Sequence, residues 1–198
     1  MSPPVPEQII LQAPVLVLPG VFERDFCAEL IRRHEADGSF ASGFFVGSEE
    51  VVDASVKRRR DHRIEPGTAL FQAIAERLAA RLLPEMRKAF HAAPANGERF
   101  AVVCYDGAEA GHFVRHRDDR GAATAHRQFA VTVNLNDGFA GGELVFPEYA
   151  PHLYCPAQGE AIAFSGSMLH EVRPVTMGRR YAFLAFLHDA ASEARRRR

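Results

Sequence analysis

The sequence has few cysteines, almost no net charge and no long apolar run. Cys27, Cys104 and Cys155 are an odd set without Cys-x-x-Cys spacing, which indicates reduced, packed thiols and no closed disulfide framework. A net charge of -1 excludes a general electrostatic attraction to nucleic acid or to an anionic membrane. No segment approaches the roughly 20 apolar residues of a membrane span, and Met1 to Gly20 lacks the basic start of a signal peptide. We therefore expect a cytoplasmic protein that recognises its partners through a local binding site.

The length of 198 residues suits one domain with a substantial core. We expect a single catalytic domain over 1–198, with N-terminal support over about 1–98 and a barrel core over about 99–190. In the first part, apolar residues at helical spacing predict one helix over 21–37 and a second over about 66–91.

From Arg99 onward the sequence consists of short apolar runs separated by glycine, proline and aspartate. Many short strands at this spacing are typical of an antiparallel sandwich or barrel of jelly-roll type. We therefore predict a mainly β protein, a jelly roll with flanking N-terminal helices packed on one sheet. The runs are 100–105, 111–116, 128–135, 142–147, 151–155, 160–164, 168–173 and 179–187.

Three side chains form a candidate metal site. His116 and Asp118 are two residues apart, so on an extended strand an imidazole and a carboxylate point to the same face. His170, in a later run with strand character, supplies a second imidazole. Two histidines and one carboxylate are the facial triad of non-haem Fe(II) oxygenases, which leaves coordination positions open for a co-substrate and dioxygen.

Two neighbouring arginines, Arg179 and Arg180, follow His170 at the start of an apolar strand. A guanidinium can hold a carboxylate by a two-point, charge-assisted contact, which a lysine does less selectively. The position is therefore suited to anchoring a dicarboxylate such as 2-oxoglutarate.

The sequence from about Arg99 to Leu187 resembles the 2-oxoglutarate and Fe(II)-dependent dioxygenases, in particular their prolyl 4-hydroxylase-like branch. Several linked motifs carry the resemblance, and their order and spacing agree with it. They are Tyr105, Phe113-Val114-Arg115-His116-Arg117-Asp118-Asp119, Leu135-Asn136, Gly141-Gly142-Glu143-Leu144, His170-Glu171-Val172 with Pro174-Val175, and Gly178-x-Arg180.

The resemblance implies a double-stranded β-helix that holds Fe(II) through His116, Asp118 and His170, with 2-oxoglutarate and dioxygen as co-substrates. It implies oxidative decarboxylation to succinate and carbon dioxide, coupled to hydroxylation of an amino-acid-like or peptidyl substrate, with prolyl hydroxylation as the nearest analogy. Two alternatives stay open: the same chemistry as demethylation or desaturation of a small metabolite, and a non-catalytic jelly-roll module for binding or sensing.

The resemblance and strand parity assign the co-substrate contacts. The Gly178-x-Arg180 spacing favours Arg180 over Arg179 as the anchor, and parity then turns Ala182 and Leu184 to the cavity and the residues between them away from it. The amide of Asn134 and the hydroxyl of Tyr105 are candidates for further contacts with the distal carboxylate. The alternative is that Asn134 and Tyr105 are ordinary strand residues near the barrel mouth.

The segment 40–65 has no readable substrate motif, but it contains the basic run Lys57 to Arg60 among short strands and an exposed loop. One interpretation is a solvated edge strand, because charges protect exposed edges from pairing. The other is recognition of an acidic or phosphorylated substrate, because the corresponding region covers the active site in similar enzymes. The charge of this segment, its glycines and its position ahead of the barrel also predict a mobile lid. Gly141-Gly142 predicts a turn or bulge with positive φ, and the basic run Arg195 to Arg198 predicts a solvated tail.

Overall fold

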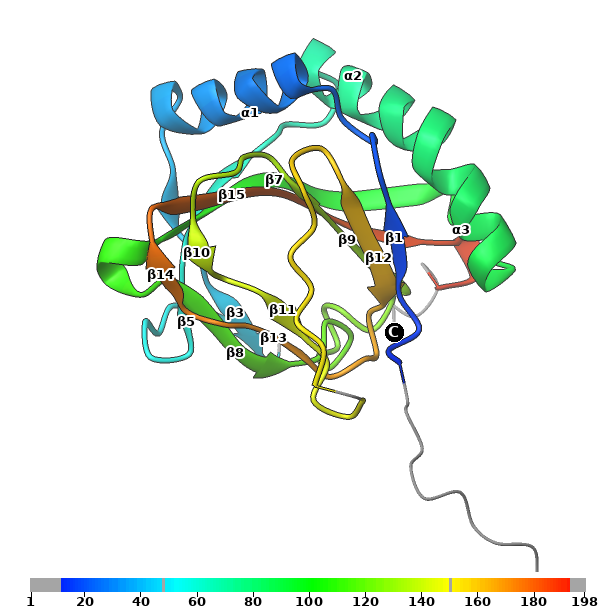
Figure 1. The fold of residues 1–198 in the computed structure, drawn as a ribbon. Helices are drawn as coiled ribbons and strands as arrows, with labels where there is room; N and C mark the ends of the chain where they lie inside the picture. Colours follow the sequence, from blue (N-terminus) through cyan, green and yellow to red (C-terminus); the bar gives the residue numbers. More distant parts are fainter. Residues whose placement is uncertain (1–11, 48, 150, 193–198) are drawn as a thin grey trace, which may run out of the picture.

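The computed structural model describes residues 12–47, 49–149 and 151–192, so the predicted tail at Arg195 to Arg198 lies outside the described residues. Two antiparallel sheets curve around a common interior (Figure 1). The larger sheet has the order β1 (Leu16–Leu18), β12 (Ala161–Ser165), β9 (Phe129–Asn134), β15 (Arg179–His188), β7 (Asn96–Asp106), β6 (Arg60–Arg63) and β2 (Phe40–Ala41). The smaller sheet has the order β11 (Leu144–Val145), β13 (His170–Val172), β8 (His112–His116) and β5 (Lys57–Arg58). Two short pairs complete the strands: β3 (Phe44–Val46) with β4 (Glu49–Val51), and β10 (Ala140–Gly141) with β14 (Val175–Met177).

The predicted mainly β jelly roll is confirmed, with differences in individual strands. The run predicted over 151–155 forms only an isolated bridge between Tyr154 and Leu144. Pro151 begins this run and Pro156 follows it, and proline has no N–H for a strand ladder. Conversely, β14 was not predicted, because it has only three residues between Pro174 and Gly178.

The predicted helices cover the larger sheet (Figure 1). The first is α1 (Arg24–Ala36), and the second is a continuous run of α2 (Ala69–Arg77), a π-helical turn (Leu78–Leu82) and α3 (Leu83–Phe90). The Thr68 hydroxyl accepts a hydrogen bond from the Phe71 N–H and so caps α2. The π turn ends beside Pro84, whose missing N–H and bulky ring do not fit a regular α-helix interior. None of the described helices is long and apolar enough to cross a membrane.

The core between helices and sheet consists of apolar side chains from both layers. Leu30, Ile74 and Leu82 are fully buried against the sheet residues Val102 and Phe183. Burying a large aliphatic or aromatic side chain contributes about 1.5–3 kcal/mol, so this layer rigidly supports the strands that line the interior.

Strand β15 separates this core from the interior pocket. Arg180, Ala182 and Leu184 line the pocket, whereas Tyr181 and Phe183 lie in the core under the helices. The side chains of this strand therefore face the pocket and the core in the alternation that was predicted.

Candidate active site

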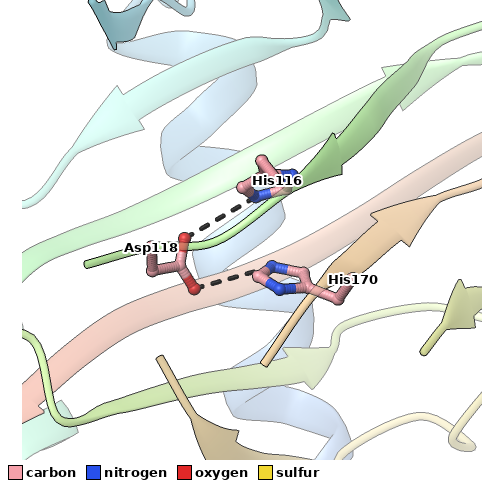
Figure 2. Close-up of side chains that lie close together, drawn as sticks. All are labelled: His116, Asp118 and His170. Carbon is pink, nitrogen blue, oxygen red and sulfur yellow. Dashed lines mark ion pairs between the residues drawn. The ribbon is translucent and has the colours of Figure 1, made fainter. Parts of the chain in front are cut away.

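Neighbouring strands β8 and β13 of the smaller sheet, with the turn after β8, bring His116, Asp118 and His170 together inside the pocket (Figure 2). The Asp118 carboxylate lies between the two rings, with Oδ1 3.6 Å from His116 Nε2 and Oδ2 3.5 Å from His170 Nε2. One ligand atom from each of the three side chains lies within 4.8 Å of the others. Atoms that bind one ion at about 2.1 Å can be at most about 4.2 Å apart, so both carboxylate–imidazole distances suit a shared metal.

Backbone carbonyls orient both imidazoles. His116 Nδ1 lies 2.8 Å from the Val114 carbonyl oxygen, and His170 Nδ1 lies 2.9 Å from that of Met168. A proton on each Nδ1 satisfies these contacts and leaves each Nε2 lone pair free for a metal. Histidines that bind a metal usually donate their other ring N–H to such an acceptor, so both imidazoles are oriented as metal ligands.

Asp118 reaches the site from a turn and not from an extended strand as expected. Strand β8 ends at His116, and the Asp118 N–H donates to the Gly166 carbonyl at 2.9 Å. Gly166 is required at this point, because a Cβ there would lie 2.8 Å from the Arg127 carbonyl oxygen. The loop after β12 therefore positions the carboxylate, which the two-residue spacing alone does not reveal.

A β-bulge sets the orientation of His116. Pairing of β13 with β8 places His170 opposite His116 and Val172 opposite Phe113, so β8 contains one extra residue. As a result the Phe113 ring stacks on His116, with centroids 3.5 Å apart. Burial, together with the nearby His170, holds the pKa of His116 well below its usual value, which favours the neutral ring that a metal requires.

The donor set fits Fe(II). Among the described residues, Asp118 Oδ2 is a buried oxygen without a hydrogen-bond partner. Buried polar atoms are normally satisfied, so an unpartnered carboxylate oxygen between two imidazoles fits a cation-binding position. Two imidazoles and one carboxylate are the ligands of non-haem Fe(II) oxygenases.

The two adjacent arginines have different environments. The Arg180 residue is 3% exposed and lines the pocket, and its Nε and Nη2 donate to Asn134 Oδ1 at 3.1 and 2.8 Å. The Arg179 side chain is 59% exposed and pairs with Asp106 outside the pocket. Asn134 does not contact the pocket as expected: it is fully buried, and its Nδ2 donates to the Pro156 carbonyl. Its amide holds the Arg180 guanidinium in place.

Tyr105 lies beside Arg180, on the strand paired with β15. Its ring faces the Arg180 guanidinium at 5.6 Å, and its hydroxyl accepts a hydrogen bond from Arg59 Nη1 at 3.0 Å. Arg59 in turn donates to both carboxylate oxygens of Asp61, and Asp61 Oδ2 also accepts from the Ser42 hydroxyl. Because the Tyr105 oxygen accepts from Arg59, its own proton is available to a ligand in the pocket.

The basic run is only partly a solvated edge strand, because Arg60 is exposed but Lys57 and the Arg59 side chain are not. Lys57 is 4% exposed, and the Arg59 side chain is 5% exposed. Strand β5 is at the edge of the smaller sheet, but β6 is paired on both sides. Lys57 and Arg59 both line the pocket, of about 270 Å³. The alternative interpretation from the sequence put the whole run near a substrate but did not single out Lys57 and Arg59, and their two-residue spacing was the available signal.

Comparison with known proteins agrees with this geometry. A family model described as the 2OG-Fe(II) oxygenase superfamily matches residues 85–188, more than half of the chain. A PKHD-type hydroxylase of Pseudomonas putida is 30% identical over 181 residues, which cover 85% of this chain and 75% of that protein. A PKHD-type hydroxylase of Delftia acidovorans is 38% identical over 63 residues, 31% of this chain and 28% of that protein.

Solved structures share the fold. A Pseudomonas putida prolyl-4-hydroxylase has a TM-score of 0.65 at 21% identity, covering 90% of this chain and 94% of its own. A Trichoplax adhaerens prolyl hydroxylase, solved with a peptide fragment of the hypoxia inducible factor oxygen degradation domain, has a TM-score of 0.72 at 16% identity and covers 92% and 87%. These likenesses support the jelly-roll architecture.

Proposed function

Because the chain belongs to the 2OG-Fe(II) oxygenase superfamily, we propose that His116, Asp118 and His170 hold its Fe(II). The observation that carries this assignment is the convergence of the three ligand atoms in one pocket that also contains the buried Arg180. We further propose that the whole chain is one catalytic domain and that it works in the cytoplasm, where its three free cysteines would stay reduced.

Each pocket residue has a defined task in this proposal. Arg180 binds the distal carboxylate of 2-oxoglutarate, Tyr105 donates its hydroxyl proton to the same group, and Asn134 keeps the guanidinium in position. Bound Fe(II) supplies activation of dioxygen, coupled to oxidative decarboxylation of 2-oxoglutarate. Apolar side chains on the pocket wall, such as Leu184, exclude water from the reacting groups.

The proposed reaction is hydroxylation of an amino-acid-like or peptidyl substrate. The relatives are described as PKHD-type hydroxylases, and two structural neighbours are prolyl hydroxylases. A prolyl group is therefore the nearest analogy for the substrate. A search for products heavier by about 16 Da, in reactions with and without 2-oxoglutarate, tests the hydroxylation.

The metal assignment is tested by succinate production. The purified protein with Fe(II) should convert 2-oxoglutarate slowly to succinate without a prime substrate, and His116→Ala, Asp118→Ala and His170→Ala should abolish this. His112→Ala is a matched control, because His112 lies on the same strand, outside the pocket lining, and contacts backbone carbonyls. Unchanged succinate production in all three triad variants would overturn the assignment.

A further inference from the structure

The pocket wall is strongly basic. Of the described residues that line it, Asp118 is the one carboxylate, and it belongs to the proposed metal site. The basic lining residues are Lys57, Arg59, Arg99, Arg115, Arg117, Arg120, Arg127 and Arg180. An excess of one charge in a concave, poorly solvated site attracts ligands of the opposite charge.

Three of the arginines that line the pocket already pair with an acidic side chain that is not part of its lining. Arg59 pairs with Asp61, Arg99 with Glu50, and Arg127 with Glu98. These pairs are locally neutral, so they contribute shape and hydrogen bonds more than net charge.

Lys57 differs from these arginines. Its ammonium donates to the Gly43 carbonyl oxygen at 2.6 Å and lies 4.7 Å from the centre of the Phe113 ring. Among the described residues, no carboxylate forms an ion pair with it, although Asp61 and Asp118 are close enough to influence it electrostatically. An ammonium has three donors, and burial without a counterion is unfavourable. Lys57 therefore has donor capacity for a pocket ligand.

Lys57 is close to the proposed metal site. It is opposite Phe113 in the pairing of β5 with β8, and the Phe113 ring stacks on His116. Arg180, in contrast, is in the larger sheet, where it contacts Asn134 and pairs with Tyr105. The two carboxylates of 2-oxoglutarate would be used at the metal and at Arg180, so Lys57 would be left for another anion.

Resting on the function proposed above, we propose that Lys57 binds a free carboxylate of the prime substrate, close to the carbon that is oxidised. The substrate is then a free amino acid or a similar small carboxylic acid, and not an interior residue of a peptide. The cavity of about 270 Å³ agrees with a small substrate, because it must also admit 2-oxoglutarate and ligand pockets usually range from about 300 to 1,000 Å³.

The test compares the standard free amino acids with their primary amides and with peptides that contain the same residue in the interior. Binding is measured by ligand-observed NMR to protein loaded with Zn(II) and 2-oxoglutarate, and turnover by succinate formation with Fe(II). A free acid should bind at least about 30-fold more tightly than its amide, which is the size expected for a desolvated charge-assisted contact.

Lys57→Met should remove the preference for the acid over the amide and leave the KM for 2-oxoglutarate within about threefold. Arg58→Met is the matched control, because the neighbouring Arg58 donates to the Glu109 carbonyl outside the pocket. If Lys57→Met does not fold, the comparison of acid with amide in the unaltered protein still tests whether the pocket binds a free carboxylate.

Three results would overturn the proposal: equal binding of acids and amides, a preference for the acid that persists in Lys57→Met, or failure of every free amino acid to bind. Selective binding of an acid without any succinate formation would support the carboxylate site and count against the proposed function instead.

Discussion

Replacing Arg180 with alanine should weaken 2-oxoglutarate binding by about 30-fold or more, whereas Arg179→Ala should change it only slightly. The contrast tests the proposed anchor directly, because the two residues are adjacent and have the same side chain. Loss of a buried, charge-assisted contact costs about 2–5 kcal/mol, and about 1.4 kcal/mol corresponds to a factor of ten in affinity.

The environments of the two side chains explain the difference in magnitude. Arg180 is 3% exposed, so water cannot replace its contact with a carboxylate, and Asn134 holds the guanidinium before the ligand arrives. Arg179 is exposed and pairs with Asp106, and an exposed ion pair contributes only about 0–1 kcal/mol to stability. Its removal changes neither the pocket wall nor the metal ligands.

Isothermal titration calorimetry under anaerobic conditions, with Fe(II) bound, measures the affinity for 2-oxoglutarate in each variant. Arg180→Lys should recover part of the affinity, because it restores the charge without the two-point geometry. A large loss in Arg179→Ala with a small loss in Arg180→Ala would show that the carboxylate binds on the other face of β15. The enzyme class would survive that result, but the assigned anchor would not.

Three further predictions concern the pocket and its cover. Segment 40–65 should exchange amide hydrogens more slowly when a true substrate is bound, and equal protection with and without substrate would contradict the lid hypothesis. Lys57→Met should increase the free energy of unfolding at neutral pH by about 1–3 kcal/mol, because it removes a buried ammonium. The melting temperature should rise accordingly. Burial, with a contribution from Arg59, lowers the pKa of Lys57 in the folded protein, so the unfolded chain binds more protons between this pKa and the usual lysine value. Stability of the unaltered protein should therefore rise with pH across that window, and pH-dependent thermal melts of Lys57→Met should lack this rise. Gly142→Ala should destabilise the fold by about 1–3 kcal/mol and weaken 2-oxoglutarate binding, because Gly142 has a φ of +71° and a Cβ there would lie 3.0 Å from Arg180 Cδ; chemical denaturation and calorimetry measure the two effects.

Local patterns in the sequence predicted the jelly roll and most of the candidate site. The Gly178-x-Arg180 spacing of similar sequences selected Arg180 as the pocket residue. Alternation along β15 then placed Arg179 outside the pocket, because neighbouring side chains on a strand point to opposite faces. The linked motifs around His116 and His170 indicated the oxygenase family, and the positive φ values of Gly141 and Gly142 agree with the predicted turn.

Only the tertiary structure decided which polar groups are buried and what they contact. Lys57 reads as a surface residue within a basic run, and its burial depends on Gly43 and Phe113, which distant pairings bring beside it. Asn134 has the expected strand parity, but its amide is used by Arg180 and by the Pro156 carbonyl. Periodicity in a sequence reports the face on which a side chain lies. The partners on that face come from strands far apart in the chain, and those partners determine whether a charge is neutralised, orients a neighbour or remains available to a ligand.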